Sequence, residues 1–191
     1  MIYLEEFKRY FINEKTFTFG DAKRFMEKHG STQAYTKLLL HNLLEKKSIV
    51  KLGKGVYTFS KNEEVAGFAF TPFYYGLEYA LTIRGLWTQM SVPIVITSTK
   101  ALPGVREVSG RRIVIRRISK DMFFGFDYVK YAGIFVPVSD LEKTLIDFIY
   151  YKIGIDNGEI SDLVRKADKR KLQKYAHRMN IVPNALKSIL D

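Results

Sequence analysis

Residues 31–59 read STQAYTKLLLHNLLEKKSIVKLGKGVYTF. Ser31 is expected to cap a helix, because its hydroxyl can accept a hydrogen bond from an amide of the first turn. Within the helix, leucines recur at helical spacing and predict one apolar stripe: Leu39, Leu40, Leu43 and Leu44. Polar residues at the start of the helix are predicted to face the other way: Thr32, Gln33, Thr36 and Lys37. The helix should end at the pair Lys46-Lys47.

A β-hairpin is expected to follow the helix directly. β-forming residues stand on both sides of Gly53-Lys54-Gly55, and glycine tolerates the positive φ of a tight turn. Lys51 and Lys54 lie near the tip, so the predicted hairpin is basic.

A helix with a polar start followed by a basic hairpin is typical of the second half of a winged helix-turn-helix domain. The start of such a helix can enter the major groove, where Gln33 can pair with an adenine edge, while hairpin lysines approach phosphates. If the helix is rotated, Tyr35 and Thr36 would read bases instead, since each residue turns the helix by about 100°. A protein-binding adaptor built on the same elements is the alternative.

The residues before this stretch complete the predicted domain. Apolar residues at helical spacing indicate a helix over 1–12. Thr18 and Asp21 resemble a capping box at the start of a second helix, which Gly30 should end. A polar change of composition near Asn62 marks the expected boundary between a winged helix-turn-helix domain, residues 1–62, and a second domain, residues 63–191. The predicted fold class is α+β.

Charge points to a polyanionic partner. The net charge is +11 with a pI near 9.7, and binding to phosphates releases counterions. Lys and Arg outnumber Asp and Glu by six over residues 1–62, equal them over 63–160 and exceed them by five over 161–191. The chain has no cysteine, no apolar run of membrane-spanning length and no secretory pattern. We therefore expect a cytoplasmic protein that does not enter a membrane and has no disulfide, thiolate metal site or cofactor.

The second domain is expected to mix helices and strands. Apolar spacing predicts a helix within 73–89, a buried strand over 92–96, a hairpin over 105–118 and a strand over 134–138. The hairpin carries Arg111, Arg112, Arg116 and Arg117. These arginines could form an anion-binding surface or a charged sheet edge that resists aggregation.

The helix that begins near Asp140 offers the chain's most enzyme-like cluster of acids. Asp140, Glu142 and Asp147 could be read as the acids of a metal-dependent nuclease. The alternative, which we favour, makes Ser139 and Glu142 a capping box and Lys143 and Asp147 an exposed ion pair one turn apart. A basic helical tail follows residue 158, and it could contact DNA or form a solvated face.

Three motifs together resemble the AbiEi-like antitoxins of type IV toxin–antitoxin systems: GKGVYTF, YYGLEYALTIRGLWTQ and VPVSDLEKTLIDFIYY. The resemblance implies an N-terminal winged helix that represses its own operon. From the predicted recognition helix we expect the protein to bind a repeated sequence in its own promoter. The residues that the resemblance implies for DNA contact are Ser31, Thr32, Gln33, Thr36, Lys37, Lys51 and Lys54. It implies no catalytic residue, and a nucleotidyltransferase-like toxin as a functional partner without a stable complex. The sequence is compatible with a homo-oligomer and leaves the operator open.

Overall fold

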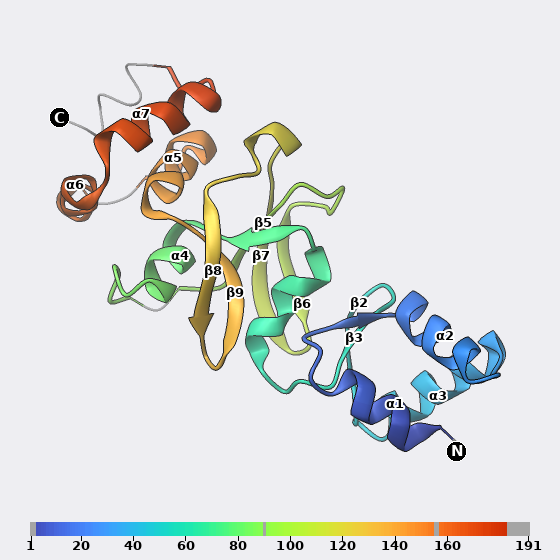
Figure 1. Ribbon diagram of the computed structural model, residues 1–191. Helices are drawn as coiled ribbons and strands as arrows, with labels where there is room; N and C mark the ends of the chain where they lie inside the picture. The colour runs from blue at the N-terminus through green and yellow to red at the C-terminus, as the bar shows by residue number, and fades with distance from the viewer. Residues whose placement is uncertain (1–2, 90, 155–156, 183–191) are drawn as a thin grey trace. The chain divides into compact units, whose positions relative to one another are not determined.

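The computed structural model describes residues 3–89, 91–154 and 157–182. The chain divides into two compact units: one runs through Thr71 and includes Glu107–Arg111, and the other comprises Pro72–Arg106 and the chain from Arg112 onward. Helices occur in both units, and each unit has its own sheet (Figure 1). The predicted α+β class is confirmed.

The first unit begins with three α-helices and a small sheet. Its elements are α1 (Leu4–Phe11), β1 (Phe17–Thr18), α2 (Phe19–Lys28), α3 (Gln33–Glu45), β2 (Val50–Gly53), β3 (Val56–Thr58) and η1 (Glu63–Phe70). The strands pair antiparallel in the order β1-β3-β2. The predicted helix over 1–12, the second helix and the hairpin are all present.

The start of α2 shows why a local pattern can predict a helix end. The Asp21 amide donates to Thr18 Oγ1 at 3.1 Å, and the Thr18 amide donates to Asp21 Oδ2 at 2.8 Å. Both bonds satisfy amides that the first turn leaves without helical partners. The predicted capping box, with Asp in place of the usual Glu, is confirmed.

Aromatic side chains form much of the core of the first unit. Phe7, Phe11 and Phe17 are buried and in contact, with ring centroids 4.6–5.7 Å apart. Leu39, Leu40 and Leu43 complete this core from α3. The predicted apolar stripe is therefore correct for these leucines, while Leu44 is only half-buried at its margin.

The first unit continues past the expected boundary at residue 62. Asn62 caps η1, since the Glu64 amide donates to its side chain at 2.8 Å. Val65 and Ala66 of η1 are buried, and Glu64 accepts a hydrogen bond from Arg111 at 2.8 Å. The polar run that suggested a linker thus starts a packed helix.

A mixed sheet forms the centre of the second unit. Its strands are β4 (Phe73–Tyr75), β5 (Ile94–Thr97), β6 (Gly104–Val108), β7 (Arg111–Arg117), β8 (Phe126–Tyr131) and β9 (Ile134–Ser139). They lie in the order β6-β7-β5-β4-β9-β8. β4 pairs parallel with β9 and antiparallel with β5, and β5 pairs parallel with β7. The strands expected over 92–96 and 134–138 and the hairpin over 105–118 are confirmed.

The helix expected within 73–89 is present but shorter than its apolar pattern, which extended to Leu86 and Trp87. Phe73, Tyr74 and Tyr75 form β4 instead, and only Leu77–Ile83 is helical, as α4. All three aromatic residues are buried between β5 and β9 in the sheet. Three consecutive buried residues fit an interior strand, whose two faces are both covered.

Helices pack against this sheet, and further helices follow in the C-terminal part of the chain. The remaining elements are η2 (Lys120–Met122), α5 (Leu141–Tyr151), α6 (Asn157–Lys166) and α7 (Lys169–Arg178). α4 and α5 pack against each other and against β9, and α7 packs on α5 (Figure 1). The predicted basic helical tail corresponds to α6 and α7. Within the described residues, no helix has the length and apolar character needed to cross a bilayer.

Candidate nucleic-acid interface

The first turn of α3 is capped by Thr32. The sequence had suggested Ser31 as the cap. Thr32 Oγ1 accepts a hydrogen bond from the Tyr35 amide at 3.2 Å. Ser31 instead closes α2, because its amide donates to Met26 O at 2.9 Å after Gly30 adopts a φ of +74°. Such a left-handed glycine followed by a bond to the preceding turn is a common helix end.

α3 turns two of the predicted base readers toward the protein interior. Thr36 is fully buried, and its hydroxyl donates to Thr32 O at 3.0 Å. Tyr35 is half-buried and packs against the core. Assigning Thr36 to the exposed face is therefore wrong. Its position three and four residues before Leu39 and Leu40 puts it on the same helical face as the leucine stripe.

The exposed face of α3 consists of two adjacent rows along the helix axis. One row contains Gln33, Lys37 and His41, each four residues after the last, and all are exposed. The other contains Ala34 and Leu38, which are also exposed. Residues four apart lie one above the other on a helix. Sequence reasoning missed Ala34, Leu38 and His41, although the spacing from Gln33 and Lys37 could have found them.

The hairpin places its two lysines in solvent. Lys51 on β2 and Lys54 at the turn are exposed, and Gly55 adopts a φ of +71°. Gly55 O accepts a hydrogen bond from the Phe19 amide at 2.9 Å, which ties the hairpin turn to the start of α2. The hairpin is thus held to the helical part of the same unit.

Positive charge on these elements is not neutralised by the protein itself. Lys37, Lys51 and Lys54 have no ion-pair partner among the described residues. Elsewhere in the unit, Lys8 pairs with Glu5 and Arg24 with Asp21. α3 and the hairpin therefore each carry lysines that are available for an external anion.

The four arginines predicted to crowd the β6–β7 hairpin do not form one cluster: two contact other side chains of the protein and two are exposed. Arg111 pairs with Glu64, and the Arg116 guanidinium lies 5.2 Å from the Tyr151 ring centroid. Arg112 and Arg117 are exposed. β7 lies between β6 and β5, so the expectation that these residues protect a sheet edge is wrong for this strand. Half of these arginines are occupied by contacts inside the protein.

The acids at the start of α5 hold helices together. Asp140 caps α5 by accepting from the Lys143 amide at 2.8 Å, so the predicted capping box of Ser139 and Glu142 does not form. Glu142 instead accepts from the Asp168 amide at 2.9 Å and pairs with Lys171 at 2.8 Å. Burial disfavours the charged Glu142, but the hydrogen bonds from Lys171 and Asp168 outweigh this and lower its pKa. These contacts attach α7 to α5.

The expected exposed pair of Lys143 and Asp147 is instead completely buried. The two side chains form an ion pair one turn apart on α5, and the Tyr74 hydroxyl donates to Asp147 Oδ2 at 2.9 Å. Lys143 Nζ also lies 2.9 Å from the Tyr74 oxygen. Burial raises the pKa of Asp147 and lowers that of Lys143, because both lose hydration of their charged forms. Within the described residues, no group of three or more acids, histidines or cysteines could hold a metal ion.

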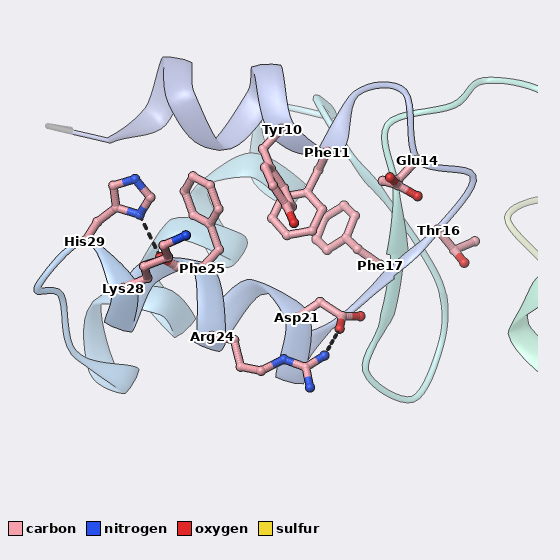
Figure 2. A pocket seen from close by; sticks show the side chains of 10 residues that line it. All are labelled: Tyr10, Phe11, Glu14, Thr16, Phe17, Asp21, Arg24, Phe25, Lys28 and His29. Carbon is pink, nitrogen blue, oxygen red and sulfur yellow. Dashed lines mark hydrogen bonds and ion pairs between the residues drawn. The ribbon is translucent and has the colours of Figure 1, made fainter.

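A pocket of about 600 Å³ lies between α1 and α2, away from the predicted DNA-binding residues. Figure 2 shows Tyr10, Phe11, Phe17 and Phe25 between the two helices, with Arg24 paired to Asp21. Its lining also includes Glu14 and Lys28, so its full formal charges balance. It therefore lacks the excess of positive charge that a polyanion requires, and it contains no residue of α3 or of the hairpin.

Comparisons with known proteins do not assign a family. A scan against models of protein families and a search of curated proteins each gave no match. The resemblance to AbiEi-like antitoxins therefore rests on the three sequence motifs.

Proposed function

We propose that the first unit is a winged helix-turn-helix domain and that the protein is a sequence-specific binder of double-stranded DNA. The observation that carries this proposal is the set of exposed lysines without acidic partners, Lys37 on α3 and Lys51 and Lys54 on the hairpin. They belong to the same compact unit as the exposed Gln33. Phosphates would neutralise the lysines while bases meet the side chains of α3.

The dimensions of α3 support this arrangement. An α-helix with its side chains is about 10–12 Å across, and the major groove is about 12 Å wide. α3 has its capped N-terminus in a short turn after α2, as the recognition helix of a helix-turn-helix does. Thr32 and Gln33 lie at that end and are exposed. With α3 in the major groove, Gln33 would contact base edges, and Ser31 and Thr32 would lie beside the sugar-phosphate backbone of the DNA.

We further propose that the protein is a cytoplasmic antitoxin of a type IV toxin–antitoxin system, without enzymatic activity, that represses its own operon. This part is supported by the resemblance of its three motifs to AbiEi-like antitoxins. The partner would be a nucleotidyltransferase-like toxin encoded next to it, neutralised without a stable complex. The nuclease alternative gains no support from α5, where the acids pair with Lys143, Lys171 and backbone amides.

Gln33→Ala should relax base preference at one position of each promoter repeat and leave the affinity for random DNA nearly unchanged. A glutamine amide both donates to and accepts from adenine, a pairing that discriminates by about 1–3 kcal/mol. A competition assay against single-base variants of the protein's own promoter measures this. Gln173→Ala, which changes an exposed glutamine on α7, is the matched control. If wild type and Gln33→Ala rank the variants identically, Gln33 does not read sequence.

The growth of cells that express the toxin, with and without this protein, tests the antitoxin role. Expressing a nucleotidyltransferase-like protein from the neighbouring gene should stop growth, and co-expressing this protein should restore it. A tagged copy should not retain the toxin through washing, since no stable complex is expected. An empty vector is the control. Continued growth arrest in the presence of well-expressed, folded protein would refute the antitoxin proposal.

A further inference from the structure

Leu38 is an exposed leucine in the middle of the α3 face that carries Gln33 and Lys37. Its side chain is 53% exposed, and its nearest exposed neighbours on the helix are Ala34, Lys37 and His41. The leucines that follow it, Leu39 and Leu40, are buried. Leu38 thus does not serve the core of its own unit, and with Ala34 it is the apolar part of an otherwise polar face.

Ala34 and Leu38 form one apolar row on this face. They are four residues apart and so lie on the same side of the helix. Gln33, Lys37 and His41 form the parallel row, about 100° around the axis. A partner that contacts α3 therefore meets hydrogen-bonding and charged groups along one row and only methyl groups along the other.

The major groove offers a group of matching chemistry. Each base pair presents hydrogen-bonding atoms there, but only thymine adds an apolar group, its C5 methyl. Ala34 and Leu38 are separated by about 6 Å along the helix axis, since each residue rises about 1.5 Å. Base pairs are stacked about 3.4 Å apart. The row is therefore long enough to contact methyl groups on adjacent or next-adjacent base pairs.

We propose that Ala34 and Leu38 select thymine in the operator by contact with its C5 methyl group, Leu38 making the larger contact. The inference rests on the proposed DNA-binding function and names part of its specificity. Gln33 reads hydrogen bonds, and Leu38 reads the presence of a methyl group one turn further along α3. Each promoter repeat should then contain thymine at one or two neighbouring positions that Gln33 does not read.

Deoxyuridine tests this, because replacing thymine by deoxyuridine removes only the methyl group. The tightest duplex is first selected from a random pool with the full-length wild-type protein, and each thymine is then replaced singly. With deoxyuridine at the position that Leu38 contacts, the duplex should bind wild type about fourfold more weakly than the thymine duplex does. This is the loss of affinity expected for one buried methyl group. Leu38→Ala should bind the thymine and deoxyuridine duplexes at that position equally. Ile12→Ala, which truncates an exposed residue of the segment after α1, should retain the wild-type difference.

Two further readouts separate the outcomes. At the same position, 5-methylcytosine should bind wild type more tightly than cytosine, and Leu38→Ala should not distinguish them. Unchanged circular dichroism of Leu38→Ala is expected because the side chain is largely exposed. Selective duplex binding without any deoxyuridine effect, or with an effect that persists in Leu38→Ala, overturns the methyl-reading inference alone. Absence of duplex binding at low salt overturns the proposed function together with it.

Discussion

Asp147→Ala is expected to lower the free energy of unfolding of the second unit by about 3–5 kcal/mol, the usual loss when one member of a buried ion pair is removed. Lys143 would then be a fully buried amine without its ion-pair partner, and its remaining neighbours include the Tyr74 hydroxyl and the rings of Tyr74 and Phe124. The chain's one tryptophan, Trp87, lies in this unit. Its fluorescence during urea unfolding measures the change.

An exposed ion pair supplies the matched control. Asp162 and Arg165 pair on α6 with side chains 63% and 76% exposed, so Asp162→Ala should cost at most about 1 kcal/mol. The double variant Lys143→Met, Asp147→Leu should recover most of the lost stability, because it leaves no charge buried. A loss of less than about 1 kcal/mol in Asp147→Ala would contradict the burial of this pair.

Duplex affinity is expected to fall about 40-fold between about 50 and 200 mM salt if Lys37, Lys51 and Lys54 each neutralise one phosphate. This corresponds to a slope of about −2.7 in a plot of log affinity against log salt concentration. Lys54→Ala should reduce the magnitude of the slope by about one and weaken selected and random DNA equally. Fluorescence anisotropy of a labelled duplex at several salt concentrations gives the slopes.

Lys8→Ala is the control for the salt experiment. Lys8 belongs to the same unit but pairs with Glu5 on α1, so its removal should leave the slope unchanged. A salt-independent affinity would refute the electrostatic part of the proposed function. Equal slopes for wild type and Lys54→Ala would remove the hairpin turn from the interface.

Short-range patterns were readable without a structure. The capping box of Thr18 and Asp21, the leucine stripe of α3 and the hairpin around Gly53-Lys54-Gly55 depend on residues a few positions apart. Of the predicted interface, Gln33, Lys37, Lys51 and Lys54 are exposed as expected. Such features follow from helical and strand geometry within one segment, so periodicity and turn chemistry predict them.

The sequence by itself determined the α+β class, the helices and hairpin of the first unit and the excess of positive charge. Tertiary structure alone decided that Phe73–Tyr75 is a strand and that Lys143 and Asp147 are buried. Each of these depends on distant residues: Tyr74, which bonds both charged side chains, precedes Asp147 by 73 positions. A polar side chain is predicted to be exposed unless a partner compensates its lost hydration, and only folding brings that partner into contact.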